Sequence, residues 1–303
     1  MTAFCGLGQW RGAAEVYDGE GRFLGGGVDE RHARRELEDG RIRIDLSFVG
    51  PFRFAGHYVI RDRGTHRVYE GPTNHGLAEA VAANLVDAES FWPAVGLSQR
   101  FFLMVLPGGD RQLSLSLLGR GDRLIYAVVG ENERATACSA DGSAEAPGWR
   151  ALASCDLAAD PTAGQGVAPL HRPGRWAGTL ALHDGTLART GEAAYEEIVT
   201  PAARGGIEVA LRGGAFGDDP TGMSLRTDGR AAWSEAGPVV GSYALFGGRA
   251  LVGTFHRVGA ELSVHRREVV SQDGTQKAVV QVVRRGGHRL GVQHGVLAFE
   301  ARG

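Results

Sequence analysis

The stretch Gly8-Gln9-Trp10-Arg11-Gly12 returns 166 residues later as Gly174-Arg175-Trp176-Ala177-Gly178, and this repeat predicts the organisation of the whole chain. Further matches follow in the same order and at nearly the same offset: Tyr17-Asp18-Gly19 with His183-Asp184-Gly185, residues 42–46 with 207–211, and Gly71-Pro72 with Gly237-Pro238. Ordered matches at one offset indicate an internal duplication. We therefore expect a first copy over residues 1–137 and a second over 174–303. Residues 138–173, rich in Ala, Gly, Ser, Asp and Pro, are the expected linker.

Both copies consist of short runs in which apolar and polar residues alternate. In residues 42–49 the even positions hold Ile, Ile, Leu and Phe, whereas positions 43, 45 and 47 hold Arg, Asp and Ser. This period of two is typical of a half-buried β-strand. The 47 glycines against 11 prolines fit many short strands joined by tight turns. Further β-rich runs occupy 52–60, 66–70, 101–106, 111–118, 123–129, 176–183, 206–212, 250–257, 260–265, 277–284 and 289–300.

Residues 77–91 are the exception to this pattern. Leu77, Val81, Leu85 and Ala88 have helical spacing, and Pro93 follows. The segment therefore predicts one short helix in the first copy, lying either across a barrel mouth or on the outer wall.

A Gly-x-Trp that opens a run of antiparallel strands resembles the start of lipocalin (calycin) superfamily proteins. Because the motif opens both copies, the resemblance covers both halves of the chain. It implies an all-β protein of two tandem antiparallel lipocalin-like barrels, with Trp10 and Trp176 each plugging one barrel end. A barrel of roughly eight strands has room for one small ligand. The architecture is similar to carotenoid hydratase-like and natural-product cyclase proteins, but none of their catalytic residues can be matched here.

Composition excludes several classes of partner. The formal charge of −2 gives no electrostatic attraction for nucleic acid. No apolar run approaches the ~20 residues of a membrane-spanning helix, and residues 1–5 do not resemble a signal peptide. Cys5, Cys138 and Cys155 form no CxxC, and their odd number argues against a disulfide framework. We therefore expect a cytoplasmic protein with no nucleic-acid partner and no membrane insertion.

Polar and aromatic residues of the first copy are candidates for substrate binding: Tyr58, Tyr69, His75 and Trp92. His57 and Tyr58 are neighbours on one strand, so only one of them can enter the lumen. His75 precedes the predicted helix, where a barrel mouth or lid is expected.

The second copy carries the candidate acid–base groups Glu196, Glu197, His183 and His256, with Tyr195 and Trp233 as further substrate-binding residues. On a strand, Tyr195 and Glu197 share one face and Glu196 takes the other. A carboxyl group there could act as acid or base if burial raised its pKa. The alternative for each residue is a purely structural role.

Sequence motifs for other chemistries are absent. The ten histidines form no HxH or HExxH, and no Gly-x-Ser-x-Gly occurs. Gly25-Gly26-Gly27 is interpreted as a flexible turn, and the basic run at 31–35 as a solvated face. We expect no metal and no cofactor.

Two hypotheses about function remain open. The first is a cofactor-free cyclase, isomerase or lyase that positions a polyene, polyketide or terpenoid-like substrate in a barrel lumen and uses acid–base catalysis. The second is a carrier or sensor of a lipophilic ligand. A lumen carboxylate or imidazole with a strongly shifted pKa would favour the enzyme, and an apolar lumen the carrier. Imperfectly closed barrel edges could also pair two chains as a homodimer.

Overall fold

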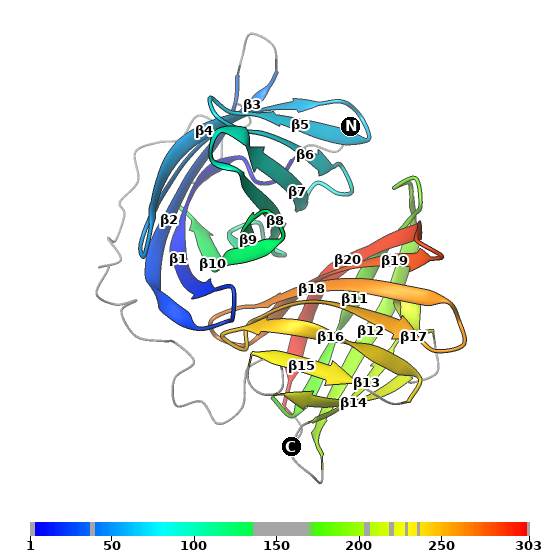
Figure 1. The fold of residues 1–303 in the computed structure, drawn as a ribbon. Helices are drawn as coiled ribbons and strands as arrows, with labels where there is room; N and C mark the ends of the chain where they lie inside the picture. Colours follow the sequence, from blue (N-terminus) through cyan, green and yellow to red (C-terminus); the bar gives the residue numbers. More distant parts are fainter. Residues whose placement is uncertain are drawn as a thin grey trace. The chain divides into compact units, whose positions relative to one another are not determined.

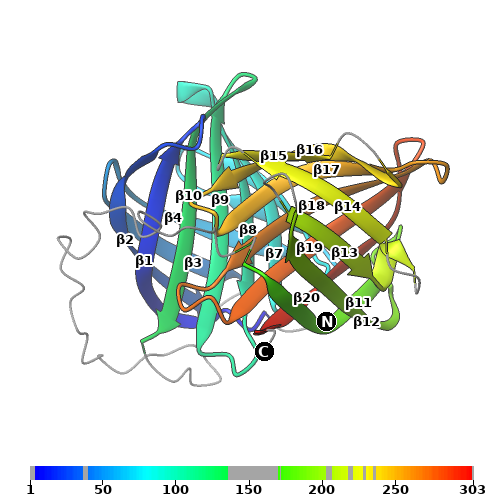
Figure 2. The same cartoon turned by 90° about the horizontal axis from the view of Figure 1, so that it is seen from below.

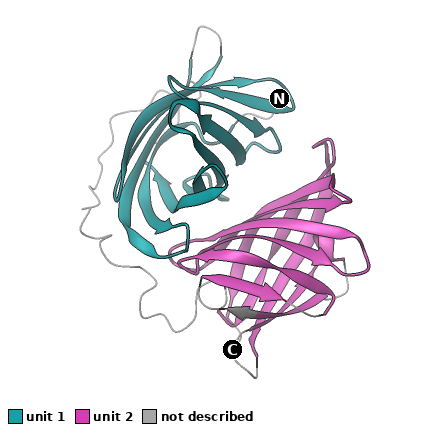
Figure 3. Ribbon diagram, viewed as in Figure 1, with its two compact units in different colours: residues 1–163 teal, residues 164–303 magenta. Residues whose placement is uncertain are grey.

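The structure is a computed structural model that describes residues 4–36, 40–135, 170, 172–202, 207–217, 221–227, 230–234 and 237–301. The chain divides into two compact units, residues 1–163 and 164–303 (Figure 3). Each unit is a closed antiparallel barrel of ten strands, in which neighbours along the chain are neighbours in the sheet and the last strand pairs with the first. The expected all-β fold of two tandem antiparallel barrels is thus confirmed, with ten strands in each barrel instead of roughly eight.

The first barrel (blue to green in Figure 1) runs from β1 to β10. Its strands are β1 (Gly8–Asp18), β2 (Phe23–Arg35), β3 (Ile42–Val49), β4 (Arg53–Asp62), β5 (His66–Glu70), β6 (His75–Glu79), β7 (Leu85–Trp92), β8 (Leu97–Val105), β9 (Arg111–Arg120) and β10 (Arg123–Arg134). The strands curve around a central axis, as the view from below also shows (Figure 2).

The second barrel runs from β11 to β20 in the same up-and-down order. Its strands are β11 (Gly174–Asp184), β12 (Arg189–Pro201), β13 (Ile207–Arg212), β14 (Thr221–Thr227), β15 (Ala231–Ser234), β16 (Val239–Phe246), β17 (Ala250–Arg257), β18 (Leu262–Val270), β19 (Gln276–Arg285) and β20 (His288–Glu300). The named helical elements of the described residues are single 3-10 turns, η1 (Pro93–Val95) and η4 (Gly214–Phe216). No helix in this part of the chain is long and apolar enough to cross a membrane.

The helix predicted over residues 77–91 is wrong. The segment forms β6 and β7, which pair with each other and lie between β5 and β8. Leu77, at 56% exposure, points outward, whereas Ala78 and Ala88 are buried in the lumen wall. Pairing on both sides provides the backbone groups of β6 and β7 with hydrogen-bond partners, and this outweighs the weak helical spacing of the apolar residues.

Residues 23–35 also differ from expectation. Gly25-Gly26-Gly27 lies inside β2 and pairs with β1 instead of forming a turn. The basic run at 31–35 belongs to the same strand, so its side chains alternate between lumen and outer wall. Arg31 lines the lumen and is therefore not part of a solvated face.

The duplication is visible strand by strand. β11 and β12 have the lengths of β1 and β2 at an offset of 166, and β17, β18 and β19 follow β7, β8 and β9 at an offset of 165. The glycines of the two motifs have the same structural role in both barrels. A Cβ at Gly12 would lie 1.8 Å from the Glu131 carbonyl oxygen, and one at Gly178 would lie 2.5 Å from that of Val296. The second glycine of each motif thus lets the first and last strands approach closely.

Both motif tryptophans are buried, Trp10 at 1% exposure and Trp176 at 0%. The Trp10 indole Nε1 donates a hydrogen bond to the Gly6 carbonyl oxygen at 2.9 Å, and the Arg134 guanidinium lies 4.3 Å from the ring centre. At Trp176 the cation over the ring is Lys277, 4.9 Å from the ring centre. Each tryptophan belongs to the buried hydrophobic core of its barrel.

Most of the predicted linker, residues 138–169 and 171, lies outside the described residues. Leu170 is buried in the core of the second barrel, and the Arg172 guanidinium lies 3.5 Å from the centre of the Phe299 ring. These two residues therefore pack with the second unit.

Candidate functional site

The first barrel encloses a cavity of about 190 Å³. Aromatic side chains surround the end opposite Trp10: the ring centres of Phe48 and Phe52 lie 4.6 Å apart, and Phe52 stacks on Tyr126. Phe54 meets Trp92 edge-on at 6.3 Å. The apolar part of the wall is completed by Ile42, Ile44, Leu46, Ile60, Val86, Ala88, Phe101, Leu103, Leu118 and Val128.

A layer of polar side chains interrupts this apolar wall. On β2, Arg31 forms a two-point ion pair with Asp29, and its Nη2 lies 3.3 Å from the Ser114 hydroxyl. The guanidinium lies 5.1 Å from the centre of the Phe101 ring. Arg31 Nη1 and Gln112 Oε1 are buried without a hydrogen-bond partner among the described residues. A buried polar atom without a hydrogen-bond partner lowers the stability of the fold and is rare in native proteins.

Arg67 on β5 is the second cation of the cavity wall. It is 5% exposed, and its guanidinium lies 5.8 Å from the centre of the Phe4 ring. The carboxylate that lies nearest to it among the described residues is Asp62, with Oδ2 3.9 Å from Arg67 Nε. Nη1 has no hydrogen-bond partner in the part of the chain that the structure describes.

Tyr58 and Tyr69 also line the cavity. Burial raises the pKa of each hydroxyl to about 12, although nearby Arg31 opposes the rise at Tyr58 and Arg67 opposes it at Tyr69. Both hydroxyls therefore stay protonated near neutral pH and can donate hydrogen bonds.

The structure brings together three of the four first-copy candidates. The cavity is lined by Tyr58, Tyr69 and Trp92, each at a strand position whose side chain points inward. His75 is exposed and lies on the outward face of β6. Of the neighbours His57 and Tyr58, it is Tyr58 that enters the lumen.

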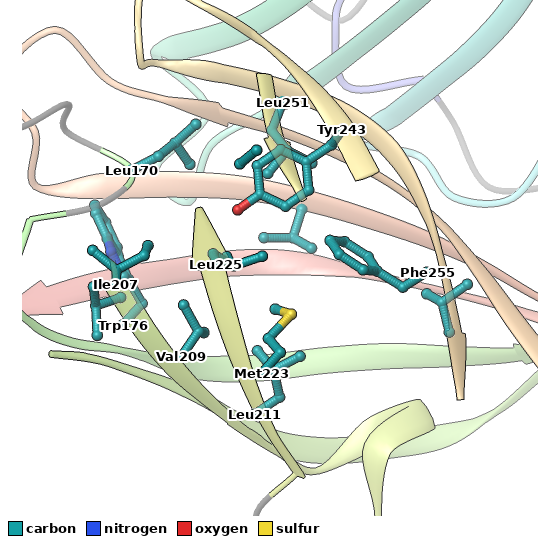
Figure 4. Close-up of a cluster of buried hydrophobic side chains, with 14 of the residues drawn as sticks. Leu170, Trp176, Ile207, Val209, Leu211, Met223, Leu225, Tyr243, Leu251 and Phe255 are labelled. Carbon is teal, nitrogen blue, oxygen red and sulfur yellow. The ribbon is translucent and has the colours of Figure 1, made fainter. Parts of the chain in front are cut away.

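The second barrel has a filled interior. Its core includes Trp176, Met223, Tyr243 and Phe255, whose side chains converge between the strands (Figure 4). A cavity of about 20 Å³, close to the volume that one water needs, lies among the described residues of this core.

Four buried charges form a cluster inside this second core. Glu197 contacts both Arg266 and Lys277, with its Oε2 2.5 Å from Lys277 Nζ. Glu268 contacts the same two cations, with 3.2 Å to Lys277 Nζ. Burial favours a neutral carboxyl group, but Arg266 and Lys277 outweigh it and hold the pKa of Glu197 below its ordinary value. At Glu268 burial dominates and raises the pKa, so this carboxylate is the first of the two to protonate as the pH falls.

The second-copy candidates do not share one site. Glu197 and Tyr195 point into the filled core, as their shared parity predicts. Glu196 lies on the outer wall and pairs with Arg175 at 2.8 Å and Arg212 at 3.2 Å. The other three candidates are also on outward-facing strand positions: His183, His256 and Trp233.

His183 nevertheless has a notable partner. Its Nε2 lies 3.2 Å from Nε2 of His294, and the two rings stack with centres 5.3 Å apart. Only one of the facing nitrogens can carry the shared proton, so a second proton is disfavoured. Burial, helped by the charges of His183 and Arg189, lowers the pKa of His294 to about 4.

This shift predicts a pH-dependent stability. An unfolded histidine binds a proton below its ordinary pKa of about 6.5, whereas folded His294 does not until about pH 4. His294 thus contributes stability that is fully present above pH 6.5 and is lost as the pH falls toward 4, by about 2–3 kcal/mol. Urea unfolding across this range should show a shallower decline in His294→Gln than in the wild type. The exposed His288→Gln control should keep the wild-type slope, and equal slopes in all three proteins would contradict the assignment.

The sequence interpretation missed Asp29, Arg31 and Arg67. Strand parity could have found Arg67, because it shares a face with the candidate Tyr69 two residues away. The sequence interpretation did not find Asp29 and Arg31 because β2 contains three consecutive glycines in its first half and ends in a basic run, and neither feature is typical of a lumen-facing strand.

Metal binding has no support in the described residues, which contain no group of three or more His, Cys, Asp or Glu side chains placed to hold an ion. Cys5 is free and exposed, whereas Cys138 and Cys155 lie outside the described residues. The polar groups on the apolar wall of the first barrel are guanidinium, hydroxyl and amide groups and the Asp29 carboxylate.

No protein-family model and no curated protein matches the sequence. Among solved structures, an S-type phycobiliprotein lyase from Guillardia theta matches 44% of this chain and 90% of its own, at 9% identity and a TM-score of 0.37, which is a weak similarity. A protein of unknown function from the DUF3598 family of Nostoc punctiforme matches at 12% identity and a TM-score of 0.59, with 98% of this chain and 97% of that chain covered. The chain is therefore similar to this DUF3598 protein in fold, over the full length of both barrels.

Proposed function

We propose that the protein binds a hydrophobic small molecule in the lumen of its first barrel. The observation that carries this proposal is the cavity of about 190 Å³ with a largely apolar, aromatic wall. Small-molecule sites combine such a wall with a few polar groups that fix orientation. The second barrel acts as a structural copy, since its interior is filled.

Comparison of the two copies supports a cavity that the sequence specifies. At three lumen positions the first barrel carries a smaller side chain than the second barrel has at the same strand offset. Ser90 of β7 corresponds to Phe255 of β17, Ala33 of β2 to Val199 of β12, and Ser116 of β9 to Gln281 of β19. An unfilled apolar space costs packing energy, so small residues at these positions fit a lumen that receives a ligand.

A catalytic role as a cyclase, isomerase or lyase stays a prediction. Tyr58 and the Asp29–Arg31 pair provide the cavity with polar groups, which is the requirement for acid–base chemistry. None of Glu196, Glu197, His183 and His256 is among the residues that line it. Binding is thus the better-supported function, and cytoplasmic location and homodimer formation also stay predictions.

The test uses N-phenyl-1-naphthylamine, a neutral apolar dye whose fluorescence rises in an apolar environment. Wild-type protein should bind the dye at a single site. Ser90→Phe, which introduces the side chain of the filled barrel at the corresponding position, should weaken binding about 10-fold or more by occupying the lumen. Ser47→Phe on the outward face of β3 is the matched control and should bind like the wild type.

Leu46→Trp provides a second way to fill the lumen if Ser90→Phe folds poorly. Thermal unfolding of each variant separates loss of binding from loss of structure. Absence of dye binding by the wild type, or equal binding by well-folded Ser90→Phe, Leu46→Trp and Ser47→Phe, would refute a ligand site in this lumen.

A further inference from the structure

We infer that the ligand of the first barrel carries a carboxylate, and that Arg67 binds this group inside the lumen. The inference rests on the proposed function, because it specifies the chemical class of the molecule in the same cavity. It limits that class to apolar acids and disfavours neutral hydrocarbons, alcohols and amines.

Charge balance is the first argument. The residues that line the cavity include two guanidinium groups, Arg31 and Arg67, and a single carboxylate, Asp29. Asp29 is engaged by Arg31 at two points. Asp62, the carboxylate nearest to Arg67, does not line the cavity, and its side chain is one-third exposed to water. The wall therefore carries one positive charge in excess.

The state of Arg67 is the second argument. A guanidinium has five donors and cannot lose its charge near neutral pH, so burial without strong partners is costly. Arg67 is only 5% exposed, yet its Nη1 has no hydrogen-bond partner among the described residues. Its contact with Asp62 is long, 3.9 Å from Nε to the carboxylate oxygen. A carboxylate in the cavity would supply the missing acceptor through a charge-assisted hydrogen bond.

The second barrel shows how the same fold satisfies lumen cations without a ligand. There Arg266 and Lys277 face two carboxylates, Glu197 and Glu268, from the chain itself. At the strand positions of Glu197 and Glu268 the first barrel has Arg31 and Leu103. Among its described residues the first barrel thus has no second lumen carboxylate of its own, and an acidic ligand would restore an even balance.

The position of Arg67 also sets the orientation of the ligand. Phe4 and Tyr69, which lie beside Arg67, belong to the same core cluster as Trp10. Phe48, Phe52 and Phe54 belong to a separate cluster. The carboxylate would therefore lie on the Trp10 side of the lumen, where the protonated Tyr69 hydroxyl is a further donor, and the apolar body would extend toward the phenylalanines.

The test compares decanoate with 1-decanol as competitors for bound N-phenyl-1-naphthylamine near neutral pH, where decanoate is ionised. Wild-type protein should bind decanoate about 10-fold or more tightly than 1-decanol, because only the acid can pair with the guanidinium. Arg67→Gln should remove this preference while its affinity for 1-decanol stays within about 2-fold of the wild type. Arg61→Gln is the control, because it removes one cation from the outer wall of β4, where Arg61 pairs with Glu70.

Equal affinity of the wild type for the acid and the alcohol would overturn the inference, as would an unchanged acid preference in Arg67→Gln. Either result leaves the proposed function standing as long as the neutral dye binds and Ser90→Phe excludes it. If Arg67→Gln folds poorly, Arg67→Lys provides the alternative: it keeps the charge but loses the planar donor pair, and should retain part of the preference.

Discussion

Replacing Glu197 by glutamine is expected to destabilise the protein by about 3–5 kcal/mol, because it leaves a buried positive charge without its partner. Glu197 is the carboxylate that joins Arg266 to Lys277 inside the second barrel, and all three side chains are almost fully buried. After the substitution these two cations share only Glu268, whose pKa burial already raises. Urea-induced unfolding at neutral pH, followed by circular dichroism, measures the loss directly.

Glu196 provides a control one residue away. It has the same side chain and also contacts two cations, Arg175 and Arg212, but on the outer wall, where these guanidinium side chains are 42% and 51% exposed and Glu196 itself is 15% exposed. Glu196→Gln should cost much less than Glu197→Gln, since water solvates the two cations that lose their partner. Similar losses for the two variants would show that the buried cluster does not have the energetic role assigned to it.

The cost should come from imbalance and not from the absence of charge. Replacing Glu197, Arg266, Glu268 and Lys277 together by apolar residues of similar volume is expected to be far less harmful than Glu197→Gln alone. Measured beside the single variant, this quadruple variant separates the contribution of charge pairing from that of packing.

Local patterns were sufficient to predict the duplication and many of the strands, although they indicated no strand at β2, β12, β14, β15 or β16. The alternation in residues 42–49 became β3 with the bounds Ile42–Val49, and the repeated Gly-x-Trp-x-Gly opened β1 and β11. These features are encoded by neighbouring residues or by identical residues at one offset, so they can be found without a structure. The helix prediction for residues 77–91 was wrong because the helical spacing of four apolar residues is a weak signal compared with strand pairing in a closed sheet.

The candidate site was harder to predict than the fold. Which barrel is empty depends on the volumes of side chains from all ten strands, a property that no short segment carries. The acidic Tyr195-Glu196-Glu197 segment drew attention to the second copy, but the partners of Glu197 lie 69 and 80 residues further along the chain. Conversely, the importance of Arg67 follows from the shortage of nearby carboxylates, which only the assembled lumen reveals.

Trp10→Ala is the second change with a large expected effect, a loss of about 3–5 kcal/mol of stability. The indole is 1% exposed, donates a hydrogen bond to Gly6 and lies under the Arg134 guanidinium. Its removal would eliminate these contacts and leave a void in the buried core of the first barrel. Urea unfolding measures the loss, and Trp233→Ala, on a partly exposed outward position of β15, should cost about 1 kcal/mol or less.

Trp10→Ala should also affect ligand binding in a specific way. Phe4, which packs in the Trp10 cluster and lies beside Arg67, would lose support together with Gly6, so water would reach the Arg67 guanidinium more easily. A hydrated guanidinium binds a carboxylate less strongly, and the preference for decanoate over 1-decanol should therefore fall even under conditions where the variant remains folded. A stable Trp10→Ala protein with the full acid preference would show that this tryptophan neither closes the barrel nor keeps the Arg67 end of the lumen dry.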